Sequence, residues 1–183
     1  NGHKKGKGSG SGGKEDDYEE IIDWFEILLE EINEQLDLMN AKLENAVGIS
    51  AKKSLISQIL STNHYELGKL NEGLKLYTDY AAELLKDVPE QYREAVQNGA
   101  VDITEFLGEA NKDTVEAINK YREWAQKIAD VNQQLEEVKK TISDLRVEAL
   151  DMINTEYENE IGLITVVNDR IKDTIDLLEE KGE

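Results

Sequence analysis

Apolar side chains recur at alternating steps of four and three residues along most of this chain. The clearest series lies in the C-terminal half and runs through Ala117, Tyr121, Trp124, Ile128, Val131, Leu135, Val138, Ile142, Leu145, Ala149 and Met152. A mean period of about 3.5 residues places such side chains in one stripe along an α-helix, and a partner helix is needed to cover that stripe. The pattern therefore predicts long helices that pack along their lengths.

Two earlier stripes predict two helices within residues 16–88. The first begins at about Asp16, has one extra residue between Ile32 and Leu36, and comprises Tyr18, Ile21, Phe25, Leu28, Ile32, Leu36, Met39, Leu43 and Ala46. The second comprises Ile56, Ile59, Asn63, Leu67, Leu70, Leu74, Tyr77, Ala81, Leu84 and Val88. Gly48 lies between the stripes and can end a helix, so we expect the break near residues 47–50.

Residues 89–112 are predicted to form a connector with short helices. Pro89 can open a helix but cannot continue one, and Asn98-Gly99 is a strong stop signal. Asp102 and Glu105 have the spacing of a capping box, which suggests a second short helix that ends near Gly108.

A long helix is expected over residues 113–180. At about 1.5 Å per residue it has a length of about 100 Å. Its stripe slips after Met152 and then resumes as Tyr157, Ile161, Ile164, Asn168, Ile171, Ile175 and Leu178. Such a slip locally unwinds a coiled coil, so a possible break is placed at residues 154–162.

These elements predict an all-α fold, an elongated antiparallel helical hairpin or coiled-coil bundle with one long C-terminal helix. Residues 1–15 consist mostly of Gly, Ser and Lys and are expected to form a flexible linker. The side chains expected to pack in the helix seams are Trp24, Phe25, Leu28, Ile32, Leu67, Leu70, Leu74, Tyr77, Tyr121, Trp124, Ile128, Leu135, Ile142 and Leu145.

Charge narrows the choice of partners. The chain has 21 Lys and Arg against 40 Asp and Glu, a net charge of −19. Such a surface repels phosphate backbones, so we expect no nucleic-acid binding. The longest mostly apolar run, Ile161–Val167, is too short for a bilayer, which needs about 20 residues, so no membrane span is expected. The chain does not begin with Met, and we expect it to be a piece of a longer polypeptide or a processed product.

Candidate chemistry is sparse. The chain has no Cys and two His, and only His64 lies in the helical body, so the chain cannot supply the two Glu-x-x-His motifs of a di-iron bundle. His64 and Ser61 would lie on one helix without an oxyanion hole, which argues against a catalytic triad. Residues 8–14 match part of a phosphate-binding loop, but Glu15 stands where Ser or Thr is needed. We therefore predict a non-enzymatic protein with no cofactor, no metal and no small-molecule substrate.

Three asparagines, Asn63, Asn132 and Asn168, lie on or beside the stripes. A buried amide in a helix seam can fix the register of the pairing at some cost in stability. We therefore interpret these residues as register determinants.

Four segments of the chain resemble the motifs of a known family of helical proteins. Asp23–Glu26 resembles a "D-W-I-E" helix start, and Tyr92–Ala100 with Val101–Thr104 resembles an "N-G-x-I-D-I" connector. Asn119–Trp124 resembles a "Y-x-E-W" motif, and Tyr157–Gly162 a "Y-E-x-x-I-G" element. In this order the motifs resemble those in helical parts of tail tape measure proteins from phages of Gram-positive bacteria. The matches cover about residues 18–167, with no clear match between Gly48 and Asn63.

The resemblance implies a virion structural protein that helps to set tail length during tail assembly. It implies a location in the virion tail, after synthesis in the bacterial host and with a prophage as one possible origin. Its partners would be copies of itself or other tail proteins, bound through the helix seams. The alternative is a coiled-coil interaction module of a bacterial surface or secreted protein.

Overall fold

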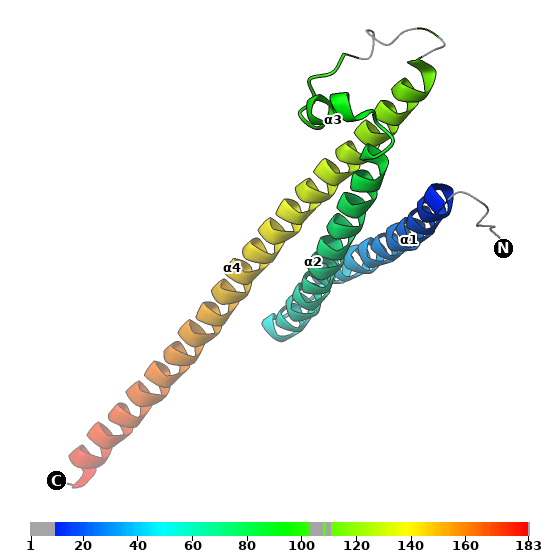
Figure 1. Cartoon of the computed structure of the whole chain (residues 1–183). Helices are drawn as coiled ribbons and strands as arrows, with labels where there is room; N and C mark the ends of the chain where they lie inside the picture. Colours follow the sequence, from blue (N-terminus) through cyan, green and yellow to red (C-terminus); the bar gives the residue numbers. More distant parts are fainter. Residues whose placement is uncertain (1–9, 103–107, 109–110, 183) are drawn as a thin grey trace.

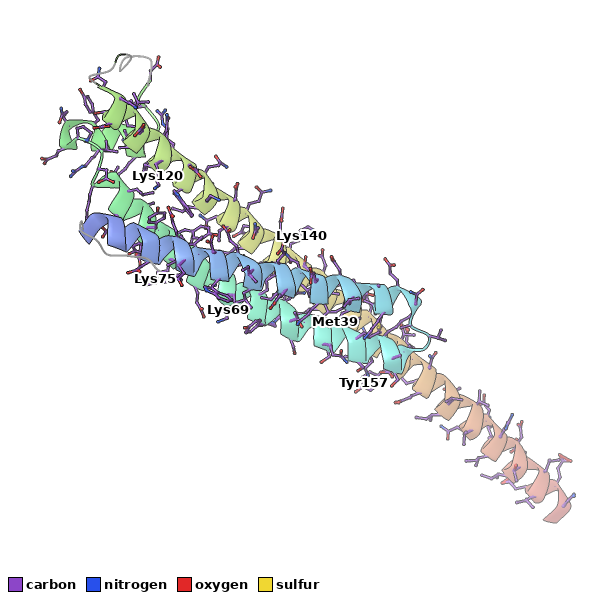
Figure 2. All side chains as sticks on the ribbon, turned by 90° about the vertical axis from the view of Figure 1, so that its right-hand side faces the viewer. Met39, Lys69, Lys75, Lys120, Lys140 and Tyr157 are labelled. Atoms are coloured by element: carbon purple, nitrogen blue, oxygen red, sulfur yellow. The ribbon has the colours of Figure 1, made fainter. Side chains whose placement is uncertain are left out.

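The protein is an elongated all-α molecule in which three long helices lie side by side (Figure 1). The structure is a computed structural model that describes residues 10–102, 108 and 111–182. Within those residues it contains α1 (Gly10–Asn45), α2 (Ile49–Leu85), α3 (Glu90–Gln97) and α4 (Lys112–Gly182), and no strand. Helices α1 and α2 form an antiparallel hairpin, and α4 runs antiparallel to α2 and continues past the end of the hairpin (Figures 1 and 2).

The turn between α1 and α2 lies at the predicted break. Helix α1 ends at Asn45 and α2 begins at Ile49. Gly48 has a φ of 93°, a left-handed conformation that residues with a side chain rarely adopt. The glycine therefore lets the chain reverse within three residues, and this short turn holds the two helices against each other.

The connector between α2 and α4 packs around a small core of its own. Val88, Val96 and Ile118 are buried together, and they join the end of α2 to α3 and to the first turns of α4. Arg93 donates hydrogen bonds to the carbonyl oxygens of Val88 and Lys86, at 2.8 and 3.0 Å. The single helix α3 fits the predicted connector, while the second short helix expected near Gly108 lies outside the described residues.

Helix α2 is the central helix and packs against both α1 and α4. Its buried positions follow a regular heptad, and the set comprises Ile56, Ile59, Asn63, Glu66, Leu70, Gly73, Tyr77, Tyr80 and Leu84, with Ala81 beside it. At Gly73 helix α2 approaches α1 closely, because a Cβ atom at this position would lie 2.0 Å from Cζ of Phe25. The ring of Phe25 thus occupies the space that a side chain at residue 73 would need.

Helix α1 has a more regular seam than the sequence suggested. Ile22 is buried whereas Ile21 is exposed, and Leu29 packs against the core alongside Leu28. With Ile22 and Leu29 in the seam, the series alternates steps of four and three without interruption from Tyr18 to Ala46. The interruption of the heptad predicted after Ile32 is therefore absent. The sequence allowed either residue of the apolar pairs 21–22 and 28–29 in the seam, and packing against α2 buries the second residue of the first pair.

Helix α4 is continuous over 71 residues, about 105 Å at about 1.5 Å per residue. The break considered for residues 154–162 does not occur. A slip in the apolar stripe changes which face is apolar without interrupting the backbone hydrogen bonds, and the single Gly162 costs only about 1 kcal/mol in a helix. From Tyr157 to Gly182 every residue is exposed, and we call this part of α4 the stem.

The N-terminal boundary also differs from the expectation of a linker over residues 1–15. Helix α1 begins at Gly10, so Gly10–Glu15 are helical, and residues 1–9 lie outside the description. Composition indicates that these residues have little to bury, but it does not prevent a helix from extending into them. Once packing has formed the helix, each added residue gains a backbone hydrogen bond.

The contact between Gly73 and Phe25 predicts opposite effects of two identical substitutions. Gly73→Ala should lower the free energy of unfolding by about 1–3 kcal/mol, since the new methyl group overlaps the ring. Gly68→Ala, on the same helix with no atom within 4 Å of its Cβ position, should raise it by up to about 1 kcal/mol. Urea unfolding followed by circular dichroism at fixed protein concentration measures both, and equal stabilisation by the two variants would contradict the packing.

Candidate interaction surfaces

A cluster of aromatic rings joins α1, α2 and α4 at one level of the bundle. Trp124 of α4 meets Tyr77 and Tyr80 of α2 edge to face, with ring centroids 5.3 and 4.9 Å apart. Phe25 of α1 meets Tyr77 in the same way at 5.9 Å. Such pairs contribute about 0.5–1.5 kcal/mol beyond the burial of their surface. The cluster therefore fixes the relative positions of the three helices.

The two tyrosines of this cluster also bind carboxylates of α1. The hydroxyl of Tyr77 donates to Glu26 at 3.1 Å, and that of Tyr80 donates to Glu19 at 3.0 Å. Burial raises the pKa of Tyr77, and the charge of Glu26 and its hydrogen bond to the hydroxyl act in the same direction. The phenol therefore stays protonated, which suits a structural hydrogen-bond donor and not an acid–base catalyst.

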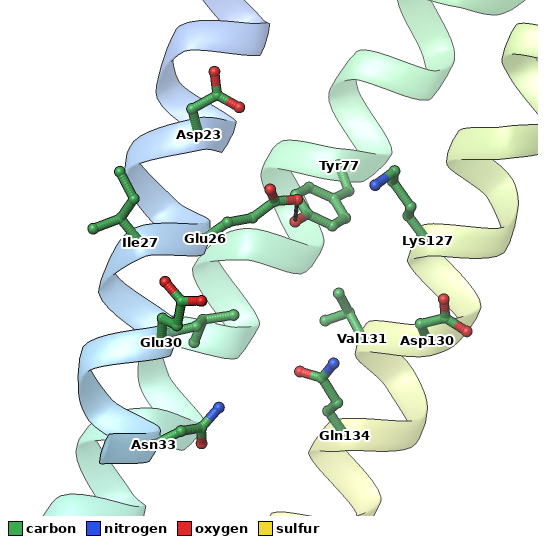
Figure 3. Close-up of a pocket in the computed structure, with 11 residues that line it drawn as sticks. Asp23, Glu26, Ile27, Glu30, Asn33, Tyr77, Lys127, Asp130, Val131 and Gln134 are labelled. Atoms are coloured by element: carbon green, nitrogen blue, oxygen red, sulfur yellow. Dashed lines mark hydrogen bonds between the residues drawn. The ribbon is translucent and has the colours of Figure 1, made fainter. Parts of the chain in front are cut away.

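A groove of about 670 Å³ lies between α1 and α4 beside this cluster (Figure 3). Tyr77 and Val131 line it together with acidic and polar side chains from both helices, which are Asp23, Glu26, Glu30, Asn33, Lys127, Asp130 and Gln134. The ammonium of Lys127 lies 5.0 Å from the ring centroid of Trp124. The lining has four carboxylates, on Asp23, Glu26, Glu30 and Asp130, against the one ammonium of Lys127, so the groove is an acidic surface channel.

Two polar side chains are buried in the α2 seam. Asn63 is 3 % exposed and its amide nitrogen has no hydrogen-bond partner in the described structure. Glu66 is 8 % exposed, and desolvation raises the pKa of its carboxyl group above the ordinary value of 4.5. Asn63 thus lies in the seam as predicted, whereas Asn132 and Asn168 are exposed. The hydrophobic pattern concealed Glu66, although its spacing of seven residues from Ile59 and Gly73 places it on the buried line.

The residues considered for catalysis are not assembled into a site. His64 is exposed, and its Nε2 lies 3.2 Å from a guanidinium nitrogen of Arg146 on α4. Ser61 is exposed on the same helix as His64. In the described parts of the chain, no group of three or more His, Asp or Glu residues is placed to hold a metal ion. No described helix has the length and apolar character needed to cross a membrane.

Thirteen of the fourteen side chains predicted for the seams are buried or half-buried. Trp24 is the exception, with 67 % of its surface exposed, whereas the neighbouring Phe25 is buried. The prediction for Trp24 was wrong because Ile22 and Phe25 take the two inward positions of this turn. One turn of a helix cannot direct residues 22, 24 and 25 to the same narrow seam.

The stem carries ten of the eighteen large hydrophobic residues that are exposed in the described chain. Its seam residues Tyr157, Ile161, Ile164, Ile171, Ile175 and Leu178 each expose between 49 and 63 % of their surface. Large exposed apolar patches mark interaction sites in proteins that remain folded in water. The stem is therefore the strongest candidate for a contact with another chain.

In comparisons with known proteins, no family model, no curated protein and no solved structure matches this chain.

The two tryptophans should respond differently to removal. Trp124→Ala is expected to lower the free energy of unfolding by about 3–5 kcal/mol, because a buried aromatic residue leaves a cavity. Trp24→Ala should change it by less than about 0.5 kcal/mol, as for other exposed positions. Chemical denaturation gives both values, and the fluorescence of each single-tryptophan protein checks the environments. A large loss on removing Trp24 would show that α1 is rotated from the position described.

Burial of Glu66 predicts a dependence of stability on pH. Because the folded carboxyl group has the higher pKa, its protonation stabilises the fold below pH 4.5, and this contribution is lost as the pH rises through the raised pKa. Glu66→Gln should therefore stabilise the protein at neutral pH but lose this advantage towards pH 4.5. Urea titrations over this range measure the effect, with the exposed Glu72→Gln as control. A destabilising Glu66→Gln at neutral pH would contradict the cost of desolvating the carboxylate.

Proposed function

We propose that this chain is a non-enzymatic structural segment of a phage tail tape measure protein, which contributes to tail-length determination and tail assembly. One observation carries the proposal, namely the unbroken length of α4, 71 residues with a stem that stands clear of the hairpin. A straight α-helix adds about 1.5 Å for each residue, so the number of residues in such a segment sets a physical length.

The placement of the resembling segments supports this proposal. Asn119–Trp124 lies in the first turns of α4, where Trp124 anchors the helix to the hairpin. Tyr157–Gly162 begins the stem, at the point where α4 leaves the hairpin. The two motifs therefore coincide with the two ends of the packed part of α4.

Charge agrees with a place in the virion tail. A net charge of −19 repels DNA, so nucleic acid can pass such a segment in a tail tube without binding to it. In this proposal the chain is made in the bacterial host, where a prophage is one possible source, and its partners are copies of itself or other tail proteins.

The hairpin favours a second candidate, a coiled-coil interaction module of a bacterial surface or secreted protein. Helices α1 and α2 fold back along α4 and so thicken the molecule without lengthening it. A three-helix base that carries a single exposed stem suits presentation of a binding surface as well as it suits a ruler. Tail length and cell-surface binding are different measurements, so the two candidates can be separated.

The ruler proposal predicts a change in tail length. Duplication of residues 154–181 in the parent virus adds four heptads, about 42 Å of helix at about 1.5 Å per residue, and keeps the seam in phase. Tails measured by electron microscopy should lengthen by about that amount. Insertion of a 28-residue Gly/Ser/Lys segment within residues 1–9 is the control. Infectious particles with unchanged tails after the stem duplication would exclude this part of the chain as a ruler and favour the interaction module.

A further inference from the structure

The seam of the stem has the regularity of a coiled coil but no partner. From Tyr157 to Leu178 the steps alternate four and three, through Ile161, Ile164, Asn168, Ile171 and Ile175. In a heptad this spacing assigns Tyr157, Ile164, Ile171 and Leu178 to d positions and Ile161, Asn168 and Ile175 to a positions. The stem thus has three successive heptads with the a and d pattern of a coiled coil, and all of these a and d side chains are exposed.

This seam follows directly on the one that α2 covers, but it faces another direction. The covered stripe ends at Met152, and the stem seam begins five residues later instead of four. One additional residue rotates the stripe by about 100° around the helix. The ion pair of Lys53 and Glu156, at 2.7 Å, is formed at this junction. A chain that packs on the stem therefore approaches from a side that the hairpin does not occupy.

The stem is apolar beyond its seam as well. Ile161–Val167 contains no charged residue, and Leu163, Val166 and Val167 are exposed outside the a and d positions. Of these three residues only Val167, in a g position, borders the seam, so pairing along the seam covers Val167 and leaves Leu163 and Val166 on the outer face.

The geometry points to a second copy of this chain as the occupant, with stems packed parallel and in register so that Asn168 faces Asn168. Parallel pairing in register places a residues opposite the same a residues. The buried amides then bond to one another. Antiparallel pairing would place Asn168 against an apolar d residue such as Ile171 and leave the amide unsatisfied, which disfavours that arrangement.

Charges beside the seam are compatible with this pairing, although each chain is strongly acidic. In a parallel coiled coil a g residue approaches the e residue five positions later on the other chain. The resulting pairs are Glu160 with Thr165, Val167 with Lys172 and Thr174 with Glu179. None of them brings like charges together. Ile at both a and d positions favours three strands over two, so we expect a trimer more than a dimer.

This inference goes beyond the proposed function and does not depend on it. Self-association follows from the exposed seam of the stem, whereas the ruler proposal concerns the contribution of helix length to a virion. The tail-length experiment can therefore fail while the association stands, and a monomeric stem would leave the ruler proposal to be judged on tail length.

The association is tested on the full chain by sedimentation equilibrium. The wild type should have a mass of two or three chains that falls on dilution. Ile164→Asp puts a charge in a d layer and should weaken association by about tenfold or more. Leu163→Asp makes the same change one residue earlier, at an outward position, and should leave the mass unchanged. Both residues lie beyond the hairpin, so circular dichroism should report a folded body in each variant.

Register is tested with single cysteines, since the chain has none. Ile175→Cys keeps Asn168 and should form a disulfide between chains under mild oxidation, because facing a positions come within the 4.4–6.8 Å or so that a disulfide spans between Cα atoms. Asp169→Cys, which points outward, should cross-link far less. A wild type that is monomeric at every concentration overturns the proposal, as does equal loss of association in the two aspartate variants. Cross-linking of Asp169→Cys without that of Ile175→Cys overturns the register.

Discussion

The buried heptad positions of α2 pack against two helices, α1 and α4, and this constraint determines how the three helices are arranged. Ile59 packs with Ile32 and Leu36 of α1, and Gly73 admits the ring of Phe25. Tyr77 and Tyr80 meet both partners, because each ring contacts Trp124 of α4 and each hydroxyl donates to a carboxylate of α1. Because the close approach at Gly73 brings α1 down onto α2, the tyrosine hydroxyls can reach the carboxylates of α1. The groove between α1 and α4 is the space that remains.

Much of this architecture could be predicted from the sequence, because a heptad is a local property of the chain. The stripes predicted the long helices, Gly48 located the turn, and Pro89 and Gly99 bounded the short helix of the connector. What local pattern could not decide was the choice between adjacent apolar residues. Ile21 and Ile22 are equivalent in composition, and only the position of α2 makes one of them buried. Trp24 was misplaced for the same reason.

Polar and small residues in the seam were harder to identify than apolar ones. Asn63 was recognised because it interrupts a stripe. Glu66 and Gly73 were missed because the adjacent Leu67 and Leu74 are apolar and were assigned to the seam instead. Their burial depends on α2 having a second partner helix, and one apolar stripe in the sequence indicates only one partner. The exposed seam of the stem was visible in the sequence from the start, but only the structure shows that the hairpin ends before the stem begins.

The arrangement of the chain ends gives the molecule a direction of mechanical resistance. The start of α1 lies near the connector, and the end of α4 lies at the tip of the stem, at the opposite end (Figure 1). Tension applied between these points pulls the helices lengthwise past one another. The force then acts in shear, parallel to the helix axes, and all layers of side-chain contacts in the seams resist it together. They do not separate one after another, as they would if the helices were pulled apart sideways. A molecule held at these two points should therefore unfold at a high force and in a single step.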